Sequence, residues 1–403
     1  MSILRSALMA GMLAFVASGS WAACAYNNTI PVKSLSAGFE AWKAVTGAMS
    51  ECGNVEAELD QEFRLKQPDA FAASPALYQI GGVSNSTLVP LLNAKTIRPL
   101  DDLIAKHGQN LRQNQLISVD GQIWAIAMMV NAQHLMYRSD ILADLGIEVP
   151  STYEELLAAA AKVAEANVVE YPLGGTWKPG FNIGIEFVNL YLGHGGEFFN
   201  DDLTPAINNE TGVAVLNLLG EMKQYMDPEI LVSDSTYVQQ QFQQGKIAMA
   251  NLWATRAAAM DDEAESTVVG KVVMAAAPNG STRPSSTLWW DGIVIAANIS
   301  DEEAEAAFQV ALEGMDSEMV EANTEVAVWL IDGYVPGRLA AGAAATAANG
   351  ALPYPASPQM GVMLNSLGNG VPAFVTGDKD AETTLADIEA EYLTKARESG
   401  LIE

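Results

Sequence analysis

The sequence has few positive charges and no long apolar run past its N-terminus, and each shortage excludes a class of protein. Lys and Arg total 21 against 49 Asp and Glu, so the formal net charge is −28. Such a charge repels phosphate backbones and anionic lipid surfaces, and we expect no nucleic acid as a partner. No run of about 18 apolar residues follows the N-terminal segment, which predicts a body that does not span a membrane. With 403 residues, 49% of them hydrophobic, the chain can bury one large or two ordinary cores.

Motifs of catalysis and cofactor binding are also missing. The sequence contains no phosphate-binding GxxxxGK[ST] loop, no GxGxxG after a strand, no GxSxG elbow and no HExxH. The three histidines, His107, His134 and His194, are too far apart in the sequence to suggest a zinc site. Adjacent acids are expected by chance in so acidic a chain. We therefore predict no catalytic residue, no cofactor and no metal.

The first 22 residues have the pattern of an export signal. Arg5 supplies a positive charge, residues 7–17 form a short apolar stretch, and Ser20-Trp21-Ala22 places small residues at alternate positions. A signal peptidase needs this arrangement, and the apolar stretch is too short to span a bilayer. We predict cleavage after Ala22.

Only two cysteines occur, Cys24 and Cys52. In the oxidising compartment that export implies, such a pair normally forms a disulfide. The alternative is that Cys24 is a lipidated first residue, which would leave Cys52 unpaired. Two cysteines alone are too few for a cysteine-based metal site.

Strand-like and helix-like segments alternate along the chain, which predicts an α/β architecture with largely parallel sheets. We expect strands at residues 29–35 and 77–83, a helix at 39–49, and a hairpin turn at Asp120-Gly121. Two helices have clear start signals, one opening at Ser151-Thr152 and one at Ser300. No low-complexity linker divides the chain, which favours two closely joined lobes.

Tryptophans stand where strands are expected to end. Trp177 follows a Gly-Gly pair, Trp253 follows an apolar run, and Trp289-Trp290 precedes Asp291. Ligands of α/β sheets bind beyond the carboxyl ends of strands, where indole faces can stack on sugar rings. This pattern predicts a polyhydroxylated ligand. The alternative is that these indoles pack in the core or between lobes.

Five segments in order resemble the family 1 extracellular solute-binding proteins of ABC importers, which are mostly carbohydrate-binding and similar to maltose-binding protein. The matching segments are Val119–Ile126 with Asn131, Leu135–Leu142 with Leu145–Ile147 and Pro150–Leu156, Gly193–Phe198, Phe242–Met249, and Asp291–Ile295 with Gly333–Arg338. Residues 36–71 match the family poorly.

The resemblance implies a type II periplasmic binding protein fold, in which ligand is clamped between two α/β lobes. It places chain crossings near Asn131, Asp291 and Pro336, so that residues 23–130 plus 291–337 form lobe I and residues 131–290 plus 338–403 form lobe II. It also implies a periplasmic monomer that delivers a sugar, glycoside or polyol to an inner-membrane ABC permease.

We assign predicted roles in ligand capture by residue type. Stacking surfaces are expected from Trp253, Trp289 and Trp290, and hydrogen bonds from Asn85, Asn131 and Asp291; Trp177 is expected to close from lobe II. Arg338 and Arg256 are the candidate cations for an anionic ligand, although the acidity of the chain favours a neutral one.

Two other functions share features of this sequence. A secreted carbohydrate-active enzyme would need a pair of carboxylates about 5 to 10 Å apart across a cleft. A chemosensory binding protein could have the same two lobes and deliver its ligand to a receptor.

Overall fold

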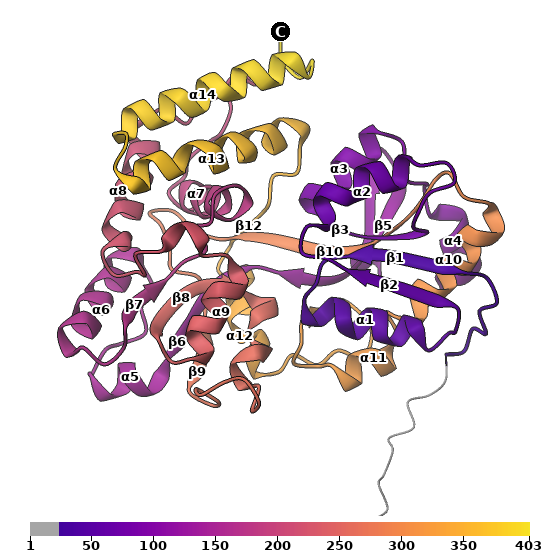
Figure 1. Ribbon diagram of the computed structural model, residues 1–403, viewed down its shortest axis with the longest axis horizontal. Coiled ribbons are helices and arrows are strands. Elements are labelled where there is room, and N and C mark those ends of the chain that lie inside the picture. The colour runs from indigo at the N-terminus through magenta and orange to yellow at the C-terminus, as the bar shows by residue number, and fades with distance from the viewer. Residues whose placement is uncertain (1–23) are drawn as a thin grey trace, which may run out of the picture.

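A computed structural model describes residues 24–403, and the predicted signal peptide, residues 1–22, lies outside this described range. Two β-sheets lie side by side, each with its own helices (Figure 1). None of the helices in residues 24–403 is both long enough and apolar enough to cross a membrane.

The larger sheet contains eight strands. Six follow in the order β11 (Val328–Trp329), β5 (Gln122–Asn131), β10 (Thr287–Ile295), β3 (Ile80–Ser84), β1 (Val32–Ser36) and β2 (Val55–Leu59), while β4 (Leu116–Val119) pairs with β5 and β12 (Leu352–Pro353) pairs with β10. Its core is shared with α1 (Glu40–Ser50), α2 (Phe63–Ala72), α3 (Asn85–Asn93), α4 (Asp101–His107), α10 (Asp301–Glu313) and α11 (Ser317–Ala322).

The smaller sheet contains four strands, in the order β7 (Tyr171–Gly174), β8 (Ile247–Trp253), β6 (Gln133–Arg138) and β9 (Val272–Ala275). Around it lie α5 (Ser139–Asp144), α6 (Tyr153–Ala166), α7 (Phe181–Gly193), α8 (Glu210–Lys223), α9 (Ser235–Gln243), α12 (Ala341–Ala348), α13 (Pro358–Thr376) and α14 (Ala381–Glu398). Its side chains alternate between two cores, with Leu135 of β6 on one face and Met136 on the other.

The α/β architecture is confirmed, but the sheets are mixed rather than largely parallel. Strands β1, β2 and β3 pair in parallel, whereas β10 is antiparallel to both β3 and β5. The reason is that β5 and β10 are the long strands that run between the two bodies in opposite directions, as β10 shows in Figure 1.

Local signals in the sequence predicted several element boundaries correctly. The β4–β5 turn has positive φ at Asp120 (51°) and Gly121 (79°), which fits the hairpin expected there. Thr152 caps α6 by accepting a hydrogen bond from the Glu155 amide, and Ser300 caps α10 in a reciprocal capping box with Glu303.

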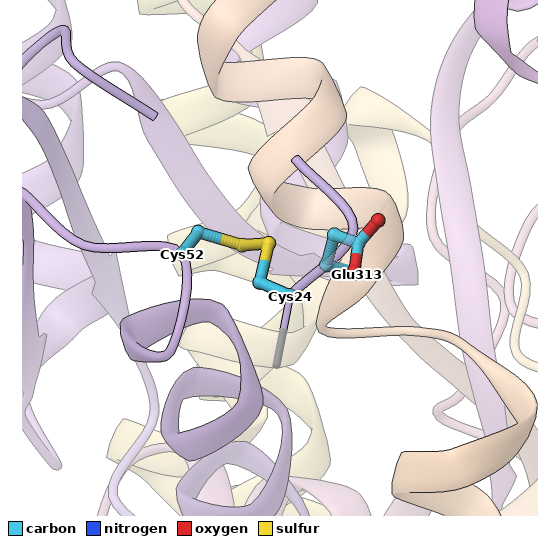
Figure 2. Close-up of side chains that lie close together, drawn as sticks. All are labelled: Cys24, Cys52 and Glu313. Carbon is cyan, nitrogen blue, oxygen red and sulfur yellow. A yellow bond between two sulfur atoms is a disulfide. The ribbon is translucent and has the colours of Figure 1, made fainter. Parts of the chain in front are cut away.

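The disulfide between Cys24 and Cys52 is present, with its Cα atoms 4.9 Å apart (Figure 2). It ties the start of the described chain to a position two residues past the end of α1. Glu313 lies beside it and accepts a hydrogen bond of 2.9 Å from the Ala25 amide. Because metals bind cysteine as the thiolate, the bonded sulfurs leave this trio without a metal-binding role.

Within residues 24–403, the chain passes between the two cores at three places. The strand β5 ends at Asn131 in the larger sheet, and β6 begins at Gln133 in the smaller one. In β10, Trp289 belongs to the smaller-sheet core, and its neighbour Trp290 packs against the larger-sheet core. The third passage lies between Tyr334 of the larger-sheet core and a residue of the smaller-sheet core, Leu339.

Candidate functional site

A pocket of about 260 Å³ opens between the two bodies and is lined from both sides. The larger-sheet side supplies Ala37, Phe39, Gln61, Glu62, Phe63, Arg64, Ser84 and Asp291; the smaller-sheet side supplies Lys178, Pro179, Phe181, Asn182, Asp234, Ser235, Thr236, Trp253, Thr255 and Arg256; and Asn131 and Trp289 come from the passages.

Most of these side chains stand at the end of a strand or in the first turn of a helix. Ser84, Asn131 and Trp253 are the last residues of β3, β5 and β8, while Phe63 and Phe181 are the first residues of α2 and α7. Ligands of α/β sheets collect at such positions, so the fold places the pocket where binding is expected.

Arg64 lies in the first turn of α2 and stacks against aromatic rings from both sides of the pocket. Its Cζ atom is 4.9 Å from the ring centre of Phe63 and 4.6 Å from that of Phe181. Arg64 is accessible to solvent overall, yet the protein packed around its guanidinium lowers the pKa of that group, an effect opposed by Asp291. It remains a cation at neutral pH. Within residues 24–403 its guanidinium makes no hydrogen bond or ion pair.

Asp291 brings a buried carboxylate to the same pocket. It lies in β10, paired with Ser84 on one side and Met129 on the other, and only 8% of it is exposed. Burial raises the pKa of its carboxyl to about 7, and the positive charge of Arg64 opposes that rise. In the described part of the chain no hydrogen bond or ion pair reaches this carboxylate, so its lone pairs are free to accept hydroxyl groups.

The charges on the smaller-sheet side are already bonded within the protein. Lys178 forms an ion pair of 3.3 Å with Asp234, which also caps α9 by accepting hydrogen bonds from the Thr236 and Tyr237 amides. Arg256 donates a 3.1 Å hydrogen bond to Gln239, and burial lowers the pKa of its guanidinium. These groups shape the mouth of the pocket, and their main partners are protein atoms.

The two tryptophans of the pocket pack mainly against other rings. Trp289 lies 4.2 Å from Tyr354, at an angle of 32° between ring planes, and makes edge contacts with Phe181 and Trp253. The exposed fractions of Trp253 and Trp289 are 8% and 4%. Little of either indole face is therefore open to a sugar ring. The two indoles form part of the pocket wall, and the stacking role predicted for them is reduced accordingly.

The structure brings four of the predicted contacts to the pocket: Asn131, Trp253, Trp289 and Asp291. Asn131 donates a 3.4 Å hydrogen bond to the hydroxyl of Thr255 and accepts one from the Ala132 amide, so it also joins the two sides. The candidate cation Arg256 lines the pocket as well.

Two predicted residues lie outside the pocket and need correction. Trp177 is fully buried in the smaller-sheet core, because the loop after β7 turns its ring inward. Arg338 forms an ion pair with Asp261 and donates a hydrogen bond to the carbonyl of Val272, which holds it against β9. Neither is among the pocket-lining residues.

Asn85 and Trp290 also lie outside the pocket lining. The Asn85 side chain accepts a 2.8 Å hydrogen bond from the Trp290 amide and donates to the carbonyl of Leu288, so it fixes the course of β10. The Trp290 ring points to the larger-sheet core because it follows Trp289 directly in a strand. We correct both from ligand contacts to supports of the crossing strand.

Arg64 and its neighbours are candidate functional residues that were not predicted from the sequence. They follow β2, a five-residue strand, Val55–Leu59, that is half exposed and was not predicted. They also fall in the segment whose resemblance to the family is poorest. The available signal was a basic residue beside an aromatic one, Phe63-Arg64, shortly after an alternating stretch.

A family model described as bacterial extracellular solute-binding protein matches residues 64–313, which is more than half of the chain. The match begins at Arg64 and includes Asn131, Trp253 and Asp291.

Solved structures of two ABC transporter solute-binding proteins and of a maltose-bound protein share the fold over nearly their whole length. One from Agrobacterium radiobacter K84 in complex with ribitol has a TM-score of 0.81 and 21% identity, covering 91% of this chain and 99% of its own. Maltose-bound MalE3 of T. maritima has a TM-score of 0.76 and 18% identity, covering 90% and 99%. One from Agrobacterium vitis S4 with D-mannitol has a TM-score of 0.74 and 18% identity, covering 92% and 99%.

Proposed function

Because the chain belongs to the bacterial extracellular solute-binding proteins, we propose that it captures a small neutral sugar or polyol in the pocket and delivers it to an ABC permease. The observation that carries this proposal is the pair Arg64 and Asp291. Two groups of opposite charge line one pocket, and neither has a hydrogen bond or ion pair elsewhere in residues 24–403.

A polyhydroxylated molecule can form hydrogen bonds with both groups at the same time. One hydroxyl donates to the Asp291 carboxylate and a neighbouring hydroxyl accepts from the Arg64 guanidinium, and bonds to charged groups are the strong ones. A ligand with a net negative charge would meet the Asp291 carboxylate at close range, which favours a neutral one. Ribitol, D-mannitol and maltose in the structural neighbours belong to this chemical class.

The size of the pocket favours a ligand as small as a monosaccharide or an alditol. Pockets for drug-sized ligands run from about 300 to 1,000 Å³. The 260 Å³ available here falls below that range, and the buried indoles leave no long stacking platform for an oligosaccharide.

We propose capture without chemistry, with the ligand held from both sides of the pocket. We take lobe I as residues 23–130 plus 291–337 and lobe II as residues 131–290 plus 338–403, a division that the separate cores support. A ligand stabilises a closed form only through its differential contacts, and here Arg64 and Asp291 hold it from lobe I while Trp253 and Arg256 close from lobe II. Removal of residues 1–22, a periplasmic location and a monomeric state complete the proposal.

A binding screen of the chain from residue 23 onward tests this function. Ribitol, D-mannitol, D-tagatose and maltose are compared with gluconate and glucose 6-phosphate by thermal shift and calorimetry, because a ligand at 100 times its Kd stabilises by about 2.7 kcal/mol. We expect the melting temperature to rise with a neutral compound, and chromatography to recover that compound unchanged after release from the protein. Binding of the anions alone, or conversion of the bound compound, would overturn the proposal.

A further inference from the structure

Behind the pocket, a chain of buried hydrogen bonds joins Trp289 to a carboxylate on α7. The indole Nε1 of Trp289 donates to the Thr287 hydroxyl at 2.8 Å, and that hydroxyl donates to Asn189 Oδ1, also at 2.8 Å. Asn189 Nδ2 then donates to Gln133 Oε1 at 2.6 Å, and Gln133 Nε2 donates to Glu186 Oε1 at 3.1 Å. All five residues are at most 5% exposed.

The direction of every bond in this chain is fixed by its first donor. An indole N–H can only donate, so the Thr287 oxygen accepts it and the single hydroxyl hydrogen of Thr287 turns to Asn189. This sets the amide of Asn189 with its oxygen toward Thr287, and the amide of Gln133 follows in the same sense. The donors therefore all point toward Glu186, which polarises the bonds in one direction.

The last acceptor of the hydrogen-bond chain is the carboxylate of Glu186, which has no cationic partner among the described residues. Its Oε1 also accepts a 2.6 Å hydrogen bond from the hydroxyl of Thr176, and no ion pair to it occurs within residues 24–403. Burial raises the pKa of its carboxyl to about 7, while the bonds from Thr176 and Gln133 oppose that rise. A charge in this position depends on the hydrogen-bond chain for its stabilisation.

The hydrogen-bond chain also connects residues at two of the three passages between the two cores. Gln133 is the residue at which the first passage enters β6, and Thr287 and Trp289 lie at the second passage, while Glu186 and Asn189 stand on one face of α7. The first residue of α7 is Phe181, whose ring contacts both Trp289 and Arg64. Helix α7 thus carries both Glu186, the end of the hydrogen-bond chain, and Phe181, an aromatic side chain of the pocket.

We infer that Glu186, Gln133, Asn189 and Thr287 are positioning residues for ligand capture, because they fix the Trp289 indole in one of its two ring orientations as a pocket wall. The torsion that turns an indole ring is broad and roughly two-fold, so packing on Tyr354 alone leaves two flips available. The bond from the indole N–H selects one of them. This inference rests on the proposed function, since it assigns these residues a role in the same pocket.

Substitutions at Thr287 separate the hydroxyl from the shape of the side chain. Thr287→Val keeps the shape and removes the hydroxyl, and Thr287→Ser does the reverse. We expect Thr287→Val to weaken binding of ribitol or D-mannitol about tenfold and Thr287→Ser to stay near the parent protein. If Val binds normally and Ser does not, the role of Thr287 is packing and the inference is wrong.

The indole N–H signal of Trp289 in a proton–nitrogen correlation spectrum reports directly on the hydrogen-bond chain. The signal is assigned by its loss in Trp289→Phe. We expect it to move upfield in Thr287→Val and, by a smaller amount, in Glu186→Gln, which removes the distant charge while keeping the size of the side chain. A matched control is Thr346→Val, since the buried hydroxyl of Thr346 also makes two hydrogen bonds but lies outside the chain. An indole signal that ignores Glu186→Gln would overturn the inference.

The spectrum needs no ligand, so its outcome is independent of the binding screen. If neither alditol binds the parent protein while the indole signal follows Glu186, the proposed function fails and the chain of bonds stands as an orienting device of the pocket wall. If an alditol binds but Thr287→Val leaves both Kd and signal unchanged, the further inference alone fails.

Discussion

The two sides of the pocket use charged residues in opposite ways. On the larger-sheet side, Arg64 and Asp291 have no bonded partner in the described chain; on the smaller-sheet side, Lys178, Asp234 and Arg256 are bonded to each other, to a helix end or to Gln239. A buried charge without a bonded partner, such as that of Asp291, is unfavourable in the empty protein and is retained where it can bind a ligand. The comparison therefore assigns recognition to one side and shape to the other.

The largest expected effect is loss of affinity on the larger-sheet side. Arg64→Met and Asp291→Asn each remove a charge-assisted bond, so we expect either variant to weaken alditol binding by about 2–3 kcal/mol, or roughly 30- to 150-fold. Lys178→Met, the matched change on the other side, should weaken it threefold or less. Calorimetric titration of all three variants measures this difference, and equal losses on both sides would remove the distinction between them.

The stability of the empty protein is also expected to depend on pH through its buried carboxyl groups. The pKa of Asp291 is raised from 3.8 to about 7 on folding, so the folded state holds this proton more tightly than the unfolded state. Its contribution to stability is therefore full below about pH 4 and is lost as the pH rises toward 7. The pKa of Glu186 is raised in the same sense.

Asp291→Asn removes that titration while keeping the size of the side chain. We expect the variant to match the parent protein below about pH 4 and to exceed its free energy of unfolding at pH 8 by about 1–3 kcal/mol. Urea unfolding at both pH values measures this. A variant that is less stable than the parent at pH 8 would mean that the carboxylate has a favourable partner in the folded protein.

A smaller effect is expected from the indole of Trp253 on the smaller-sheet side of the pocket. Trp253→Phe keeps an aromatic ring against Trp289, and since only 8% of Trp253 is exposed, we expect a loss of affinity below about 1 kcal/mol. The same change should lower the melting temperature measurably, because the core contacts of the indole are lost. A loss of affinity as large as that of Asp291→Asn would show that the ring faces the ligand after all.

Local signals in the sequence predicted the scaffold well and one side of the site poorly. The turn at Asp120-Gly121 and the caps at Thr152 and Ser300 depend on neighbouring residues alone, so they could be predicted. The inward turn of Trp177 depends on packing against residues distant in sequence, and an aromatic residue after a strand does not reveal which way its ring points.

Arg64 shows why the recognition side was hard to predict. Its partners, Phe181 and Asp291, lie more than a hundred residues away, and only the fold brings them together. Asp291 could be predicted because it stands beside two tryptophans and within a segment that resembles the family. A long-range pair without local pattern is invisible to periodicity and spacing, even when each member is a common binding residue.

The smallest expected effect on affinity comes from Asp234, whose bonds are all internal. Asp234→Ala removes the cap of α9 and the partner of Lys178, so we expect a loss of about 1 kcal/mol in stability with a change in Kd of threefold or less. Asp234→Asn separates the two roles, because Asn caps a helix as well as Asp but carries no charge. If Asn restores the stability, the cap explains the loss, and the smaller-sheet side acts through geometry. If Asn instead lowers affinity as strongly as Arg64→Met does, the charge of Asp234 contacts the ligand, and both sides of the pocket take part in recognition.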